Sequence, residues 1–209
     1  MKYEITTVEG DYEPGSNGTV LKNSLGITCP DDAFEAESEL LEALYIHVFE
    51  NLQILTKLDF KQLQEWHRNW LQPIYLWAGQ LRTVDMSKGD FRFAAAKFLT
   101  QQIKPFEANF LSKYDEVEGY SQSELVSFLA AMHAEFILIH PFREGNGRMS
   151  RLLNDVFATK AGYQPLDYQL WHTHRDYYFS SIQAAVTGDY SYLERLVSDV
   201  LVKEPSEGG

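Results

Sequence analysis

The sequence predicts an all-α protein that carries a single β-hairpin, and three observations lead to this fold class. Apolar residues recur at helical spacing through most of the chain. Only one segment, residues 81–93, alternates apolar and polar residues on both sides of a glycine turn. The 209 residues are 44% hydrophobic and 14% aromatic, which is enough for one ordinary domain with a sizeable core.

The first thirty residues are expected to form an irregular arm, and residues 31–209 a single globular unit. The arm is rich in Gly, Pro, Asn, Asp and Thr, which favour turns. Asp31 and Asp32 are typical of a helix cap, so a helix is expected over residues 32–56. Its apolar stripe comprises Leu40, Leu41, Leu44, Val48, Leu52 and Leu55.

A second helix is expected over residues 59–77, with Trp and Phe side chains in the core and Gly79 at its end. The change of period that follows predicts a hairpin flap over about residues 80–94. Gly89 is expected in its turn, because glycine adopts positive φ at little cost. Since one isolated hairpin is marginal by itself, the flap should cover a site or pack on the helices.

Helical patterning resumes after the flap and is expected over residues 96–115, 121–139, 146–161, 172–187 and 190–202. The segment 125–139 is strongly apolar and is predicted to be a buried helix. Pro141 should end this helix at His140, because proline disfavours helical geometry in the preceding residue. A histidine at the end of a rigid buried helix can face a cleft.

The net charge of −12 argues against nucleic acid or an anionic membrane as direct partners, because binding phosphate backbones requires clustered Lys and Arg. The single cysteine, Cys29, favours a reducing compartment. The N-terminal residues contain no apolar signal region, and no uninterrupted apolar stretch approaches a membrane span of ~18 residues. We therefore expect a cytoplasmic protein.

Residues 140–151 combine the features of a phosphate-binding site. Gly145 and Gly147 flank Asn146 directly before a helix, so successive backbone N–H groups can converge on an anion at the positive helix end. Arg148 and Arg151 are three residues apart, so both can project from one helix face toward a polyphosphate.

Two further residues of this loop suggest catalysis. Glu144 makes sense in an anion site if it holds Mg²⁺, which bridges phosphate oxygens. His140 would then be the general base. A histidine before proline, a Gly-x-Gly turn or an arginine pair is usually structural when it occurs alone. Their presence together beside an apolar helix favours a functional site.

This loop closely resembles the signature of the Fic family, His-x-Phe-x-Asp/Glu-Gly-Asn-Gly-Arg-x-x-Arg, and meets every fixed position. Residues 18–27 are similar to an N-terminal segment of bacterial Fic toxins and effectors. Residues 78–84, with Ser87-Lys-Gly89, are similar to the target-docking flap of the family. The resemblance covers about residues 18–190 and implies a Fic-type helical bundle with the flap over the loop.

The resemblance implies a protein adenylyltransferase that uses ATP and Mg²⁺. His140 would deprotonate a Ser, Thr or Tyr hydroxyl of a target protein, which attacks the α-phosphate. Phe142 would anchor the loop in the core, and Glu144 would coordinate Mg²⁺. Tyr177 is similar in position to an aromatic residue that holds the nucleoside, although helix packing is an equally good explanation. The phosphates would lie on Gly145, Asn146, Gly147, Arg148 and Arg151.

The hairpin around Lys88 and Gly89 would clamp the target by strand pairing. These two residues are grouped with the nucleotide site, because their backbone would fix the attacking hydroxyl near the α-phosphate. The toxin-like resemblance suggests bacterial DNA gyrase or topoisomerase IV as the target.

Many family members carry an inhibitory Ser/Thr-x-x-x-Glu-Gly/Asn helix, and this sequence has no full match. The segment from Ser38 to Glu42 has the spacing but is followed by Ala43, and residues 112–116 are followed by Val117. This resembles the class in which a separate small antitoxin supplies the helix. Alternatively, residues 38–42 are a degenerate internal inhibitor.

Three other functions are considered. The same fold could transfer another nucleotide, such as UMP or GMP, or the chain could be a nucleotide-binding regulatory module without transfer activity. A metal-dependent hydrolase could use His133 and His140, which are two helical turns apart, but no third ligand is evident.

Overall fold

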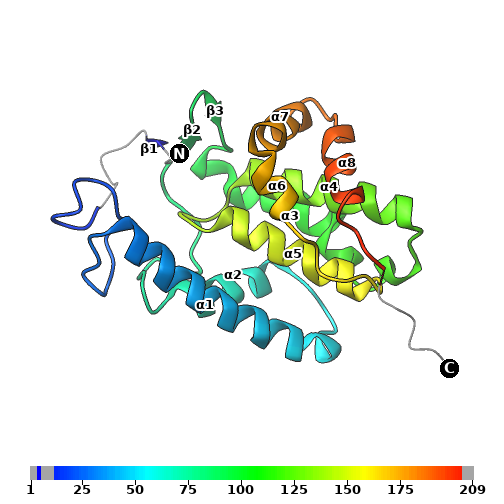
Figure 1. Ribbon diagram of the computed structural model, residues 1–209, viewed down its shortest axis with the longest axis horizontal. Helices are drawn as coiled ribbons and strands as arrows, with labels where there is room; N and C mark the ends of the chain where they lie inside the picture. Colours follow the sequence, from blue (N-terminus) through cyan, green and yellow to red (C-terminus); the bar gives the residue numbers. More distant parts are fainter. Residues whose placement is uncertain (1–3, 6–11, 204–209) are drawn as a thin grey trace.

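A strongly apolar helix, α4 (Gln122–Ile139), lies at the centre of the fold in a computed structural model that describes residues 4–5 and 12–203 (Figure 1). Ser121 begins α4 with a capping box, in which its side chain and that of Glu124 each accept a backbone N–H of the other residue. The helices packed against α4 are α3 (Leu99–Asn109), α5 (Asn146–Lys160), α7 (Arg175–Ala185) and α8 (Ser191–Ser198). Among the described helices, α4 alone is long and apolar enough to cross a membrane, which is also the composition that a core helix requires.

Helices α1 (Pro30–Glu50) and α2 (Phe60–Leu71) pack on each other along one side of the molecule (Figure 1). The expected cap at residues 31–32 is wrong by two residues. Cys29 is the N-cap, Pro30 follows it, and the two aspartates lie in the first turn near the positive helix end. Both helices end about six residues earlier than expected; α2 stops just before Pro73, and a short 3-10 turn, η1 (Leu52–Ile54), follows α1.

The expected hairpin is confirmed but is shorter than the alternating pattern suggested. It consists of β2 (Met86–Lys88) and β3 (Phe91–Arg92), with Gly89 in the turn at φ +57°. Residues Glu4–Ile5 add a third strand, β1, which pairs antiparallel with β2 and gives the order β1-β2-β3. The arm is therefore irregular only in part.

The remaining helices differ from the sequence expectations mainly where one helix is divided into several. The expected helix over 96–115 is α3 flanked by 3-10 turns η2 (Ala96–Phe98) and η3 (Leu111–Lys113), and η4 (Glu116–Gly119) precedes α4. The expected helix over 172–187 is divided at His174 into α6 (Gln169–Thr173) and α7. The all-α class with a small β element is confirmed.

Candidate active site

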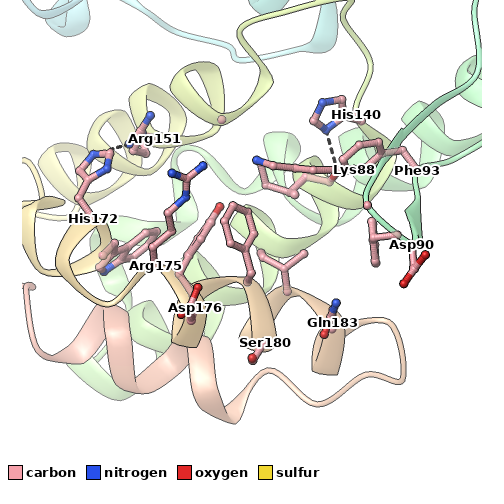
Figure 2. A pocket seen from close by; sticks show the side chains of 18 of the residues that line it. Lys88, Asp90, Phe93, His140, Arg151, His172, Arg175, Asp176, Ser180 and Gln183 are labelled. Carbon is pink, nitrogen blue, oxygen red and sulfur yellow. Dashed lines mark hydrogen bonds between the residues drawn. The ribbon is translucent and has the colours of Figure 1, made fainter. Parts of the chain in front are cut away.

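A cavity of about 840 Å³ lies between the flap, the end of α4, the start of α5 and helix α7 (Figure 2). The residues that line it and carry the argument below are Lys88, Phe93, His140, Gly147, Arg151, His172, Arg175, Phe179 and Gln183. The structure thus brings together the predicted base, one predicted arginine, one loop glycine and the flap.

His140 ends α4, as the following proline predicted, and it adopts the left-handed conformation at φ +51° and ψ +60°. Its Nδ1 donates to the carbonyl of Ile137 at 3.2 Å, because a carbonyl oxygen only accepts. The neutral ring then carries its lone pair on Nε2. Burial lowers the pKa of His140 to about 3, so the imidazole is neutral at physiological pH. A stacked Phe93 ring, 3.7 Å between centroids, fixes the ring plane. His140 therefore has the protonation state of a general base.

Arg82 holds His140 in place, and no sequence pattern pointed to this residue. Its Nε donates to the carbonyl of His140 at 2.6 Å, and its Nη atoms donate to the carbonyls of Val84, Ala94 and Ile139. Burial lowers the pKa of Arg82 to about 10, which leaves it charged at neutral pH. The guanidinium joins both ends of the flap to the end of α4.

The interior of the loop is fixed by an aromatic anchor and an amide. Phe142 is fully buried and stacks on His67, with 3.9 Å between ring centroids, so the expected anchoring role is confirmed. The side chain of Asn146 accepts the N–H of Phe142 at 2.8 Å and donates to its carbonyl at 2.7 Å. Asn146 can therefore contribute only its backbone N–H to an anion site.

His67 is a second support that the sequence did not reveal. Its Nδ1 accepts the N–H of Gly79 at 2.8 Å, which leaves Nε2 to donate to the carbonyl of Glu144 at 3.1 Å. Burial lowers the pKa of His67 to about 4 and keeps this neutral tautomer. One imidazole thus links the start of the flap segment to the active-site loop.

The first turn of α5 carries amides without an intrahelical acceptor, and one of its residues, Gly147, lines the cavity. Gly145 is the N-cap at φ +80°, and the first α5 amide bonded to a carbonyl is that of Met149, which donates to Gly145. The amides of residues 146–148 have no intrahelical acceptor, and they lie at the positive end of the helix. This arrangement supports the predicted anion nest.

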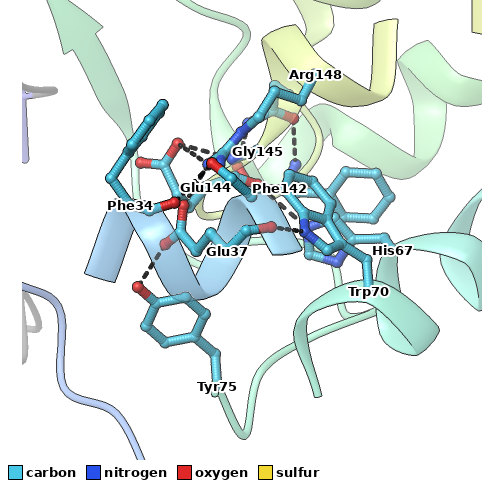
Figure 3. Close-up of polar contacts among 11 residues, drawn as sticks. Phe34, Glu37, His67, Trp70, Tyr75, Phe142, Glu144, Gly145 and Arg148 are labelled. Carbon is cyan, nitrogen blue, oxygen red and sulfur yellow. Dashed lines mark hydrogen bonds and ion pairs between the residues drawn. The ribbon is translucent and has the colours of Figure 1, made fainter. Parts of the chain in front are cut away.

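Arg148 and Arg151 have different partners in this structure, which does not support the expectation of a shared clamp. Arg148 Nη2 pairs with Glu37 Oε2 at 2.5 Å, and its guanidinium lies 4.6 Å from the ring centroid of Trp70 (Figure 3). Arg151 lines the cavity and donates to His172 Nε2 at 2.9 Å. Positions three apart on a helix differ in direction by about 60°, and a carboxylate from α1 occupies Arg148.

Glu37 is the α1 residue that contacts the loop, and no sequence pattern identified it. Its other carboxylate oxygen accepts the Tyr75 hydroxyl at 2.6 Å, and its carbonyl accepts the Trp70 N–H at 2.8 Å (Figure 3). Glu42, the glutamate of the degenerate inhibitory pattern, is exposed on α1. In the described part of the chain, Arg151 contacts His172 rather than a carboxylate of α1. These contacts do not support residues 38–42 as an internal inhibitor.

Glu144 is suited to a Mg²⁺ ion that takes most of its ligands from phosphate and water. Its Oε1 accepts the N–H of Gly145 at 2.8 Å and lies 3.7 Å from Arg148 Nη2. Burial raises the pKa of Glu144, opposed by the Gly145 N–H and by Arg148. The residues described contain no group of three His, Cys, Asp or Glu side chains able to hold a metal by themselves, so one carboxylate beside bound phosphates is the arrangement that fits.

The alternative metal role of His133 is not supported by its contacts. Its Nδ1 lies 2.8 Å from the Ser150 hydroxyl and its Nε2 lies 2.8 Å from the Tyr178 hydroxyl. Both ring nitrogens are therefore engaged by α5 and α7, and His133 links the helices that border the cavity.

The helical phase of α7 does not support the assignment of Tyr177 to the nucleoside. Tyr177 lies outside the cavity lining and packs edge-on against Tyr192, 6.0 Å between centroids. Phe179 and Gln183, four residues apart, face the cavity instead. The two predicted flap residues, Lys88 and Gly89, both line the cavity, and Lys88 Nζ lies 4.3 Å from the Phe179 ring centroid.

The fold and the site define a helical domain whose anionic ligand would lie between a helix start, a neutral histidine and a β-hairpin. The chain belongs to the Fic/DOC family, whose model matches residues 57–158. The sequence resemblance is thereby confirmed.

Named relatives and a solved structure of the same fold support this placement. The chain is 34% identical over 154 residues to a Salmonella typhimurium protein named probable protein adenylyltransferase Fic, and the match covers 72% of each chain. An Escherichia coli protein of the same name is 33% identical over 139 residues, covering 65% of this chain and 66% of that protein. A solved structure of the Bartonella tribocorum effector BepC with bound AMPPNP has a TM-score of 0.71 at 19% identity, covering 94% of this chain and 97% of that chain. The structural likeness concerns the fold.

Proposed function

We propose that this chain is a protein adenylyltransferase that transfers AMP from ATP to a hydroxyl side chain of a target protein. The observation that carries the proposal is that neutral His140 and Gly147, whose amide at the start of α5 has no intrahelical acceptor, line one cavity. The names of the bacterial relatives support this activity, and the AMPPNP bound to BepC supports an adenine nucleotide as substrate.

The geometry supports a single in-line displacement. His140 Nε2 would take the proton of the target hydroxyl as its oxygen bonds to the α-phosphorus. The bond from that phosphorus to the bridging oxygen would break, and pyrophosphate would leave. The amides of residues 146–148 would stabilise the added negative charge. Mg²⁺ held through Glu144 would neutralise phosphate charge.

The flap suggests how a target would dock. In the order β1-β2-β3, β2 is the central strand, and β1 and β3 are the two outer strands among the described residues. An extended target segment could pair with β3 beside Gly89 and present its hydroxyl to the cavity. A toxin role, a small antitoxin, gyrase or topoisomerase IV as target, and a cytoplasmic location remain our proposals from the resemblance.

Labelling separates this proposal from its alternatives. Purified protein, Mg²⁺ and bacterial lysate are incubated with ATP labelled at the α-phosphate or at the γ-phosphate. We expect protein label only from the α-phosphate, lost in His140→Ala and after chelation of Mg²⁺. Label that survives in His140→Ala would overturn the base assignment, and label from UTP or GTP alone would favour transfer of another nucleotide. ATP binding by the wild type without any label would favour a regulatory module.

A further inference from the structure

Phe34 carries an exposed aromatic ring that the packing of α1 does not explain. Its exposed fraction is 67%, whereas Ala33, the residue before it, is 8% exposed. The buried residues of α1 are Ala33, Glu37, Leu44 and Val48. Phe34 therefore lies beside the buried face of the helix rather than in it. Single exposed apolar residues are common on protein surfaces, so exposure alone does not mark a site.

The position of Phe34 distinguishes it from the other exposed apolar side chains. Among the large hydrophobic residues that are exposed in the described part of the chain, Phe34 is the one that α1 contributes to the lining of the cavity, and none of the others lines it. The same cavity is lined by His140 and by Phe91 and Phe93 of the flap segment. A ligand that extends from the flap to α1 would therefore cover the Phe34 ring.

Two contacts place Phe34 at the level of the active-site loop. Helices α1 and α5 run in the same direction (Figure 1), with Glu37 paired to Arg148 and the Tyr45 hydroxyl donating to Asp155 Oδ2 at 2.9 Å. Phe34 precedes Glu37 by about one helical turn on α1 (Figure 3). Because Arg148 lies in the first turn of α5, Phe34 lies near the level where the loop joins that helix.

A nucleotide base has other aromatic rings available to it. Trp171, Tyr178 and Phe179 line the cavity from α6 and α7. In Figure 1, α5 lies between α1 and α7, so these rings and Phe34 belong to different walls. A target segment that docks on the flap and presents its hydroxyl to His140 is the ligand that remains to cover Phe34.

We propose that Phe34 binds an apolar side chain of the target protein, close in sequence to the hydroxyl that receives the nucleotide. The inference rests on the proposed function for the existence of a protein target. A segment whose hydroxyl reaches His140 extends across the mouth of the cavity, and a neighbouring apolar side chain covers the Phe34 ring. This contact removes apolar surface of both partners from water. Phe34 thereby selects targets by the residues beside their hydroxyl.

Labelling across a dilution series of bacterial lysate, with Mg²⁺ and ATP labelled at the α-phosphate, tests this role. Phe34→Ala should need at least about fivefold more lysate for half of the maximal rate, the scale of a truncated interface residue. The difference from the wild type should shrink as lysate is added. Phe34→Leu, which keeps an apolar side chain, should lose less. ATP affinity measured by calorimetry should stay within about twofold of the wild type.

Ile46→Ala is the matched control for this experiment. Ile46 lies on the same helix and is 53% exposed, but it is not part of the cavity lining. The control should label lysate proteins like the wild type. Since both Phe34 and Ile46 are exposed, neither substitution should prevent folding.

Mass spectrometry of the labelled protein gives a second test, which does not depend on rates. The modified hydroxyl should have an apolar or aromatic residue within about three positions, because side chains of an extended segment reach only their near surroundings. A modified segment with polar neighbours alone would overturn the inference.

The remaining outcomes separate this inference from the proposed function. If the wild type labels a protein and Phe34→Ala has the same lysate dependence, the inference falls and the proposed function stands. A loss of ATP affinity in Phe34→Ala as large as its loss in labelling would also overturn the inference, because the ring would then contact the nucleotide. If the wild type labels no protein, both fall.

Discussion

Arg82 and His140 are 58 positions apart in the sequence, yet Arg82 Nε donates to the carbonyl of His140 at 2.6 Å. The same guanidinium bonds the carbonyls of Val84, Ala94 and Ile139, so the position of the proposed base depends on a residue of the flap segment. The backbone of His140 is left-handed, and this contact is one reason why that geometry persists.

Replacing Arg82 should therefore damage both stability and activity. Arg82→Met leaves four carbonyls without their donor, at about 1–3 kcal/mol for each buried group that stays unpaired. We expect the free energy of unfolding in urea to fall by about 3 kcal/mol or more and the labelling rate to fall at least about tenfold. Arg195→Met is the control on an exposed helix face. A stability within about 0.5 kcal/mol of the wild type would contradict the role given to Arg82.

Gly145 should tolerate no side chain, because an added Cβ would collide with Trp70. A comparison with Gly188 separates this collision from the strain of a positive φ. Gly145 and Gly188 have nearly the same φ, +80° and +82°, but only at Gly145 would an added Cβ lie 2.5 Å from Trp70. Gly188→Ala should cost about 1 kcal/mol through backbone strain alone. Gly145→Ala should cost about 1–3 kcal/mol more and abolish ATP binding, because the loop must move. Equal effects in thermal unfolding and calorimetry would argue against this packing.

The corrected aromatic assignment can be tested by a pair of substitutions on α7. Phe179→Ala removes a ring that lines the cavity and should weaken ATP and AMP alike by about tenfold, consistent with about 1–3 kcal/mol for base stacking on an aromatic ring. Tyr177→Ala removes a ring that packs on Tyr192 and should leave both affinities unchanged. A larger loss in Tyr177→Ala than in Phe179→Ala would restore the original assignment.

Buried neutral histidines should make stability depend on pH. Folding lowers the pKa of His133 and His140 to about 3 and of His67 to about 4, so the stability that they contribute is complete above about pH 6.5 and is lost as pH falls toward those values. Between pH 6.5 and these values the unfolded state binds more protons than the folded state. Each additional proton lowers the free energy of unfolding by about 1.4 kcal/mol per unit of falling pH. Asp155 has the opposite effect on stability below about pH 6. Burial raises its pKa to about 6, so the folded state binds its proton more readily than the unfolded state, and this contribution to stability grows as pH falls. His133→Gln should reduce the slope of unfolding free energy between pH 6 and 5 by about one proton. An unchanged slope would mean that His133 takes up a proton in the folded state.

The Glu37–Arg148 pair should behave as a coupled unit. Removing Glu37 alone leaves a mostly buried guanidinium without its carboxylate, and losses of about 3–5 kcal/mol are typical of such single changes. In a double-mutant cycle with Glu37→Gln and Arg148→Met, the double variant should be more stable than the sum of the single losses predicts by about 1–3 kcal/mol. Additive losses would mean that the 2.5 Å contact contributes little.

The extent to which the sequence predicted this structure depended on how local each feature is. The buried α4 helix, its end at His140 and the turn at Gly89 follow from neighbours in the chain, and all are confirmed. The buried position of Phe142 was implied by the resemblance and is also confirmed. The start of α1 and the division of the last helices were missed by a few residues, because the N-caps Cys29 and His174 make no side-chain cap hydrogen bond that a sequence pattern could reveal.

The parts of the site that sequence reasoning missed come from long-range contacts. Glu37 and Arg148 are 111 positions apart, and nothing in a stripe of acidic residues on α1 marks which carboxylate faces the loop. The same lack of tertiary information led to the pairing of Arg148 with Arg151. In α7 the sequence could not show that Tyr177 packs on Tyr192 while Phe179, two residues later, lines the cavity.

The hydrogen bonds of His67 have a consequence for protein design. Residues 140–151 contain the predicted base, the anion nest and the carboxylate predicted to bind Mg²⁺. A designer could therefore expect that this segment alone can be moved into another protein. Yet the carbonyl of Glu144 is held by an imidazole that needs a backbone N–H from Gly79 to select its tautomer. A scaffold that receives the twelve residues without such a histidine, itself oriented by a second segment, would display the motif but not its geometry. Grafting this chemistry into another helical bundle therefore requires at least these two additional positions.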